Sequence, residues 1–129
     1  PMLLEGQRPA IVLTGSVLGH RAVPMKSEYS AAKFALRGWS EALRCELATR
    51  GVDVILISPS TTQSEFFDNL IDSPQAKSVS LGSMSPDSVA DHMMRAIRSS
   101  KREAILSWGG KALVWSGRWF PRTLDRILT

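Results

Sequence analysis

The alternation of apolar patterns along the chain is the feature that most limits the folds it can adopt. Short apolar runs at 10–16, 53–58 and 103–108 are typical of buried strands. Between them, the segments 28–50 and 85–99 carry apolar residues three and four apart, which indicates amphipathic helices. Strand, helix, strand, helix, strand predicts parallel strands joined by crossovers, and hence an α/β fold in which helices cover a parallel sheet.

Residues that start and stop helices and strands support these bounds. Gly51 is expected to end the first helix, and Pro59 to terminate the second strand. The serine and proline at 85–86 form a cap and first turn for the second helix. The two glycines at 109–110 predict a break after the third strand, before one or two short helices around Pro121.

Between the second strand and the second helix the sequence is polar and interrupted. Six of the sixteen residues in 73–88 are serine, and only a short turn at 65–70 is expected. We predict a mobile loop here. Loops that follow strand ends in sheets of this kind commonly cover a ligand.

Composition excludes several classes of protein. The 129 residues are 43% hydrophobic and 22% charged, which suits one soluble globular domain rather than a disordered chain. No run approaches the roughly 18 apolar residues of a membrane-spanning helix. The interrupted N-terminal stretch lacks the pattern of a secretory signal, so we expect a cytoplasmic protein.

Cys45 is the only cysteine, and His20 and His92 are far apart and away from carboxylate motifs, so we expect packing or solvated histidines and no metal site.

Positive charge gathers at the C-terminal end of the chain. Residues 98–129 carry seven Lys or Arg against two Asp or Glu, whereas residues 1–97 carry nine against ten. The same end holds Trp108, Trp115 and Trp119. A basic helix with tryptophans suits a position in the headgroup layer of a membrane, and it also suits a helix that packs over a substrate pocket. We favour the packing helix.

A tyrosine, a lysine and a serine are placed where they could meet at one edge of the sheet. Tyr29, the only tyrosine, and Lys33 are four residues apart, which puts them on one face of the predicted helix. That spacing alone is weak evidence, because any amphipathic helix offers such pairs. Ser16 ends the first strand, at the carboxyl edge where ligands bind in open α/β sheets. A neighbouring ammonium favours the phenolate form of a tyrosine and so lowers its pKa. Tyr29 could then exchange a proton with a substrate while the serine holds the substrate oxygen.

The stretch 11–60 resembles the central part of the short-chain dehydrogenase/reductase family. Its sequence is IVLTGSVLGHRAVPMKSEYSAAKFALRGWSEALRCELATRGVDVILISPS. The resemblance rests on Ser16, thirteen positions before Tyr29, on the YxxxK motif that ends at Lys33, and on the strand and proline of DVILISPS. It extends over most of the chain, from 1 to 105.

The resemblance implies a particular α/β fold and an activity. Residues 1–110 would form the C-terminal half of a Rossmann-like, doubly wound parallel sheet with three α/β/α layers, followed by a basic amphipathic helical tail at 111–129. Members of the family are NAD(P)-dependent oxidoreductases that interconvert secondary alcohols and ketones by hydride transfer. Their partners are small molecules, lipid-like in some members, and not nucleic acids. Many form homo-oligomers, and some contact membranes through similar tails.

The functional residues of the family carry over onto three positions of this chain. In the family, the tyrosine exchanges a proton with the substrate oxygen, and the lysine lowers the pKa of the tyrosine and contacts the nicotinamide ribose. The serine positions the substrate. The resemblance therefore implies that Ser16, Tyr29 and Lys33 form the catalytic site.

The cofactor site that the resemblance implies is incomplete in this chain. The Pro-Gly that usually follows the second strand is replaced by Pro59 and Ser60, and Thr62 and Ser64 stand nearest to the nicotinamide contacts. The residues expected to bind NAD or NADP are Tyr29, Lys33, Pro59, Ser60, Thr62 and Ser64. The glycine-rich turn that holds the pyrophosphate belongs to the first half of the family's fold, and we do not expect the glycines in 15–19 to replace it.

We therefore expect a truncated chain that is inactive alone and binds the cofactor only in the complete enzyme. Two alternatives stay open. The chain could be a catalytically inactive fragment, or it could be a non-enzymatic module that binds a partner or a membrane surface.

Overall fold

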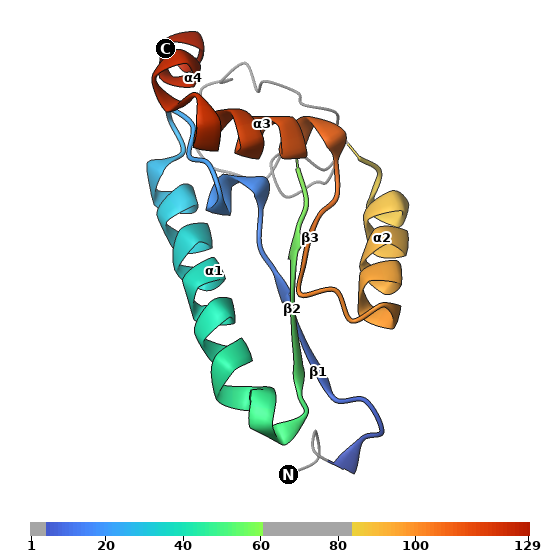
Figure 1. Cartoon of the computed structure of the whole chain (residues 1–129). Helices are drawn as coiled ribbons and strands as arrows, with labels where there is room; N and C mark the ends of the chain where they lie inside the picture. Colours follow the sequence, from blue (N-terminus) through green and yellow to red (C-terminus); the bar gives the residue numbers. More distant parts are fainter. Residues whose placement is uncertain (1–4, 61–83) are drawn as a thin grey trace.

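Three parallel strands carry the fold of the computed structural model, which describes residues 5–60 and 84–129 (Figure 1). The strands β1 (Ala10–Thr14), β2 (Asp53–Ser58) and β3 (Glu103–Ile105) lie in the order β1-β2-β3. The helices are α1 (Ser27–Leu47), α2 (Pro86–Arg98), α3 (Trp108–Trp119) and α4 (Pro121–Leu128), with two 3-10 turns, η2 (Val17–Gly19) and η3 (Ala48–Arg50). Figure 1 shows α1 and α2 on opposite sides of the sheet and α3 across one end of it. The predicted three-layer α/β arrangement is confirmed.

Strand β2 is the buried centre of the sheet. It pairs in parallel with β1 on one side and with β3 on the other. Every residue from 54 to 58 is at most 2% exposed. Ile55 and Ile57 pack with residues of α2, and because side chains alternate along a strand, Val54 and Leu56 face the side of α1. Burial of each such side chain contributes about 1.5–3 kcal/mol, so β2 anchors both helical layers.

Two helix signals predicted from the sequence are confirmed. Gly51 follows η3 with a φ of 67°, a left-handed conformation that glycine adopts without strain, and the chain leaves the helix there. The Ser85 Oγ accepts a hydrogen bond from the N–H of Ser88 at 3.3 Å and caps α2. Both ends of β2 also match the prediction of a strand over 53–58.

The end of the third strand differs from the prediction. Strand β3 ends at Ile105 rather than at residue 108, because Ser107 caps α3 by accepting a hydrogen bond from the N–H of Gly110 at 2.9 Å. The glycines at 109–110 therefore lie inside α3 and do not break the chain. A Cβ on Gly110 would lie 2.7 Å from the Val17 Cγ2, so this glycine lets α3 pack closely on η2.

The C-terminal helices share a core with the segment after β1. Val17, Leu113 and Leu124 form a buried cluster that joins η2, α3 and α4. An ion pair between Arg21 and Asp125 makes a second link to α4. The basic segment predicted from residue 111 thus belongs to α3 and α4, which pack on the body of the fold.

Turn η2 also packs against α1, at Gly19. A Cβ on Gly19 would lie 2.7 Å from the carbonyl oxygen of Lys33 and 3.0 Å from its carbonyl carbon. These are backbone atoms of a helix, so they cannot move aside as the end of a flexible side chain can. The absence of a side chain at position 19 therefore sets how closely the segment after β1 approaches α1.

A buried polar cluster joins the end of η2 to the end of β2 and the start of β3. The Nε2 of His20 lies 2.9 Å from the Ser58 Oγ and 3.2 Å from the Glu103 Oε1, and the His20 side chain is 4% exposed. Burial lowers the pKa of His20, and the Glu103 carboxylate opposes this shift. The expectation that His20 lies away from carboxylates is wrong, because the fold alone brings Glu103 beside it.

We predict that Gly19→Ala destabilises the protein by about 1–3 kcal/mol, because the new methyl group would press on the backbone of α1. Urea unfolding of the purified variant measures this change. The matched control is Gly38→Ala in the middle of α1, where a Cβ would meet no atom within 4 Å. That control should gain up to about 1 kcal/mol, since alanine favours a helix more than glycine does. Equal effects of the two variants would contradict the packing described for Gly19.

We also predict that stability falls as the pH drops below about 6.5. The native pKa of His20 lies below the unfolded value of 6.5, so the unfolded chain binds the proton more strongly. The contribution of neutral His20 is therefore complete above pH 6.5 and is lost as the pH falls through the native pKa. Urea unfolding at a series of pH values should show a shallower fall for His20→Gln. The control His92→Gln, on α2, should follow the wild type, and an unchanged slope in His20→Gln would refute the prediction.

Candidate active site

Ser16 lies at the carboxyl end of the sheet, two residues after β1. The pairing of β1 with β2 ends with Thr14 opposite Ile57, and the N–H of Gly15 then donates to the Ile57 carbonyl at 2.8 Å. Ser16 caps η2, where its Oγ accepts a hydrogen bond from the N–H of Leu18 at 3.1 Å. This bond uses the oxygen as an acceptor and leaves the hydroxyl hydrogen able to donate.

Tyr29 and Lys33 meet on one face of α1, as their spacing predicts. The Lys33 Nζ lies 5.6 Å from the centroid of the Tyr29 ring. It also donates a hydrogen bond to the Thr14 carbonyl at 3.0 Å, which ties the helix to the end of β1. Both side chains are partly buried. An ammonium has three donors, so two remain for a ligand.

The carboxylate beside Tyr29 in the sequence is fully exposed. Hydrogen bonds from its own backbone N–H and from the Ser27 side chain lower the pKa of Glu28. Glu28 is therefore charged at neutral pH in the first turn of α1, where a negative charge is favourable.

The end of β1 brings the predicted catalytic residues into one region. Thr14, which Lys33 contacts, is two residues before Ser16, and Gly19, three residues after Ser16, lies against the Lys33 backbone. Within 5–60 and 84–129, no hydrogen bond joins the Ser16 hydroxyl to the Tyr29 phenol. The fold thus holds Ser16 and Lys33 near the end of β1, without a direct hydrogen bond between the Ser16 and Tyr29 hydroxyl groups.

Two of the four residues expected to contact the cofactor after β2 are described. Pro59 and Ser60 are partly buried at the carboxyl end of β2, and the Pro59 carbonyl accepts a hydrogen bond from the N–H of Val17 at 3.0 Å. Thr62 and Ser64 lie outside the described residues, as do the predicted short turn and most of the predicted mobile loop.

Donor groups of the described residues suit one end of a dinucleotide. The Lys33 ammonium and the Tyr29 hydroxyl present donors that suit the hydroxyl groups of a ribose. No two of the nine glycines are two residues apart, so this sequence has no G-x-G-x-x-G turn to cradle a pyrophosphate.

Sequence reasoning missed two features of this region. Gly19 was only part of a weak glycine pattern, although its position three residues after Ser16 was a usable signal. Ser30 is 2% exposed and its Oγ makes no hydrogen bond within the described part of the chain. No sequence signal indicated this buried hydroxyl, because its burial depends on segments that pack against α1.

Comparison with known proteins agrees with this architecture. A family model described as short chain dehydrogenase matches residues 1–75. The uncharacterized oxidoreductase YbbO of Escherichia coli strain K12 is 32% identical over 140 residues, which cover 99% of this chain and 51% of that protein. The uncharacterized oxidoreductase YxnA of Bacillus subtilis is 34% identical over 129 residues, which cover 96% of this chain and 36% of that protein. The chain thus spans about half, or less, of the length of these curated relatives.

A solved structure has the same fold over this chain. The short chain dehydrogenase of Burkholderia cenocepacia J2315, in complex with NADP, matches with a TM-score of 0.79 at 23% identity, and the match covers 98% of this chain and 50% of that one. The predicted Rossmann-like α/β fold is therefore confirmed. Since the family model also covers more than half of the residues, this chain belongs to the short-chain dehydrogenase family.

Proposed function

We propose that the chain is the catalytic half of an NAD(P)-dependent oxidoreductase that interconverts a secondary alcohol and a ketone. Its catalytic residues are Ser16, Tyr29 and Lys33. The observation that carries this proposal is the position of the Lys33 Nζ, 5.6 Å from the Tyr29 ring and 3.0 Å from the Thr14 carbonyl. Thr14 is the end of the strand that leads to Ser16, and membership of the family supports the reaction class.

Tyr29 and Ser16 act on one substrate oxygen, and Lys33 acts on Tyr29. The Tyr29 hydroxyl gives its proton to a ketone oxygen, or the phenolate takes a proton from an alcohol in the reverse direction. The Ser16 hydroxyl, whose hydrogen is not used in capping η2, donates to the same oxygen and fixes its position. The Lys33 ammonium stabilises the phenolate that proton transfer leaves.

The nicotinamide cofactor, NAD or NADP, supplies or accepts the hydride when it is bound. Lys33 keeps two donors beyond its bond to Thr14, so contact with a ribose does not require that bond to break. The residues proposed to hold the cofactor are Tyr29, Lys33, Pro59, Ser60, Thr62 and Ser64.

This proposal assigns residues 1–110 to the C-terminal half of an enzyme and 111–129 to its tail. The chain spans about half of the length of its relative YbbO, and its sequence has no glycine-rich turn for the pyrophosphate. Tight binding of the cofactor therefore requires the other half of the fold. The substrate would be a small alcohol or ketone, and the enzyme a homo-oligomer. Without that other half, the chain would be an inactive fragment or a binding module.

A second function, attachment to a membrane surface, is supported by the outer face of α3. Trp108, Trp115 and Trp119 are 84%, 64% and 66% exposed. At 100° per residue, their side chains fall within about 40° of one another around the helix. Leu113, on the other side of α3, is buried in the core, so this tryptophan stripe cannot pack inward. The Lys111 Nζ lies 4.8 Å from the Trp108 ring, which adds positive charge to the stripe.

We infer that α3 lies in the headgroup layer of a membrane that contains anionic lipids. Tryptophan favours the boundary between apolar and wet regions, and basic residues are attracted to anionic headgroups. Arg122 and Arg126 on α4 are exposed and add to this attraction. Of the helices that the structure describes, none is long and apolar enough to cross a membrane. A lipid-like substrate would follow from such attachment.

The catalytic proposal predicts that Tyr29→Phe lowers turnover by about 10² to 10⁴, because the ring still packs but has no proton to transfer. Affinity for the cofactor should fall far less than turnover, because Lys33 keeps its donors for the ribose when the Tyr29 hydroxyl is lost. Lys33→Ala should weaken both turnover and cofactor binding, whereas the exposed control Lys101→Ala should change neither. Steady-state kinetics with a panel of alcohols and ketones, in an enzyme that joins this chain to the other half of the fold, measures these effects. Full activity of Tyr29→Phe would exclude the proposed site.

The membrane proposal predicts that the chain sediments with vesicles of phosphatidylcholine and phosphatidylserine, and less with phosphatidylcholine alone. Replacement of the three tryptophans of α3 by serine should abolish sedimentation, because the apolar surface that enters the headgroup layer is lost. The matched control is Trp39→Ser, which removes an exposed tryptophan from α1. Sedimentation of the triple variant at the wild-type level would rule out α3 as the attachment surface.

A further inference from the structure

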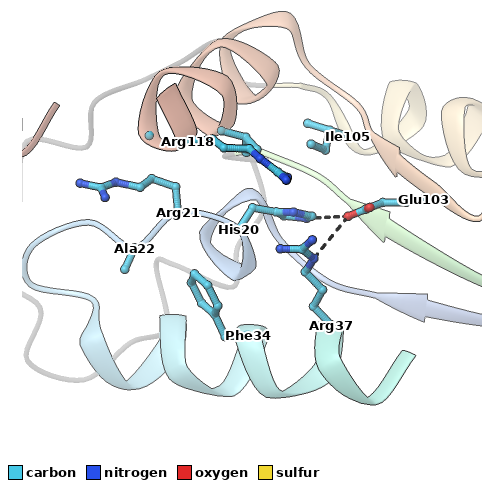
Figure 2. Close-up of a pocket in the computed structure, with 10 residues that line it drawn as sticks. His20, Arg21, Ala22, Phe34, Arg37, Glu103, Ile105 and Arg118 are labelled. Carbon is cyan, nitrogen blue, oxygen red and sulfur yellow. Dashed lines mark ion pairs between the residues drawn. The ribbon is translucent and has the colours of Figure 1, made fainter. Parts of the chain in front are cut away.

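A cavity outside the candidate active site opens beside β3 (Figure 2). Its volume is about 490 Å³, within the range of small-molecule sites. None of Ser16, Tyr29 and Lys33 lines it. Strand β3 is the edge of the sheet away from β1, so further strands added beside β1 would not fill this space.

One part of the cavity lining is apolar and comes from three elements. Phe34 of α1, Ile105 of β3 and Val114 of α3 line it together. Phe34 is 42% exposed, which is high for so large an apolar side chain. This lining suits the apolar body of a small molecule.

Positive charge exceeds negative charge in the rest of the lining. Arg37 and Arg118 line the cavity with one carboxylate, Glu103. The Arg37 Nε lies 3.8 Å from the Glu103 Oε1, whereas Arg118 makes no ion pair with any residue that the structure describes. Figure 2 shows the Arg118 guanidinium pointing toward the space between His20 and Ile105. Two guanidinium groups and one carboxylate leave an excess of one positive charge.

None of the other charged groups near the cavity forms an ion pair with Arg118 within the described residues. Arg21 also lines the cavity, but it is paired with Asp125. Glu41 lies 3.3 Å from the Arg37 Nε, so it compensates Arg37 and not Arg118. His20 is buried, and burial lowers its pKa, so it is neutral at pH 7. The Nε of Arg37 makes no hydrogen bond within the described residues, but it is ion-paired with the Glu41 and Glu103 carboxylates at 3.3 and 3.8 Å.

We propose that this cavity binds a small monocarboxylate with an apolar body. The carboxylate accepts hydrogen bonds from Arg118 and Arg37, whose planar guanidinium groups match its geometry. The apolar body lies against Phe34, Ile105 and Val114. A single negative charge balances the unpaired Arg118, whereas the second charge of a phosphate dianion would meet no unpaired cation of the lining and would be repelled more strongly by Glu103. This site is independent of the proposed oxidoreductase reaction.

Benzoate is a suitable probe, because it carries a carboxylate on a flat apolar ring. Calorimetric titration of the purified chain should show saturable binding of benzoate and weaker binding of benzyl alcohol and of phenyl phosphate. Arg118→Gln should weaken benzoate binding by at least about tenfold, since it removes a charge-assisted hydrogen bond. The matched control is Arg122→Gln on α4, which lies outside the cavity lining and should bind as the wild type does.

Nuclear magnetic resonance of the wild-type chain gives a readout that does not depend on how the variants fold. Benzoate should shift the signals of Phe34, Ile105 and Val114. Absence of benzoate binding, tighter binding of phenyl phosphate, or shifts confined to Tyr29 and Lys33 would each overturn the proposal. So would wild-type affinity in a folded Arg118→Gln variant.

Discussion

The burial of β2 between two helices and two neighbouring strands is the constraint on which the rest of the structure depends. Its residues 54–58 have almost no exposed surface, so β1, β3, α1 and α2 are all positioned against one strand. The polar end of that strand is buried as well. The Ser58 hydroxyl is paired with His20 there, as a buried polar group requires. The region around the candidate active site therefore takes its position from the carboxyl ends of the strands.

Turn η2 packs against both α1 and α3 at the end of the sheet, and two glycines allow these segments to approach closely. Gly19 lies against the backbone of Lys33, and Gly110 of α3 lies against Val17. Ser16 caps the start of the turn and His20 follows its end. The candidate active site and the cavity beside β3 thus adjoin the same short turn, at its start and at its end. A shift of η2 would change both.

Much of this fold could be predicted from the sequence, because the signals involved are local. The limits of β2, the end of the first helix at Gly51 and the cap of α2 at Ser85 each depend on residues within a few positions of one another. The approach of Lys33 to Tyr29 is of the same kind, since residues four apart share a face of any helix. The order of these elements then implied a parallel sheet, because parallel strands need long crossovers.

The sequence by itself therefore determined which segments form strands and helices, in which order, and which family they resemble. Only the tertiary structure decided what meets across long separations. It placed the Glu103 carboxylate beside His20, packed Gly110 of α3 against Val17, and gathered Phe34 and Arg118 around one cavity. The physical reason is that a local pattern fixes the conformation of its own segment. Contacts between distant side chains exist only after the buried strand has drawn those segments together.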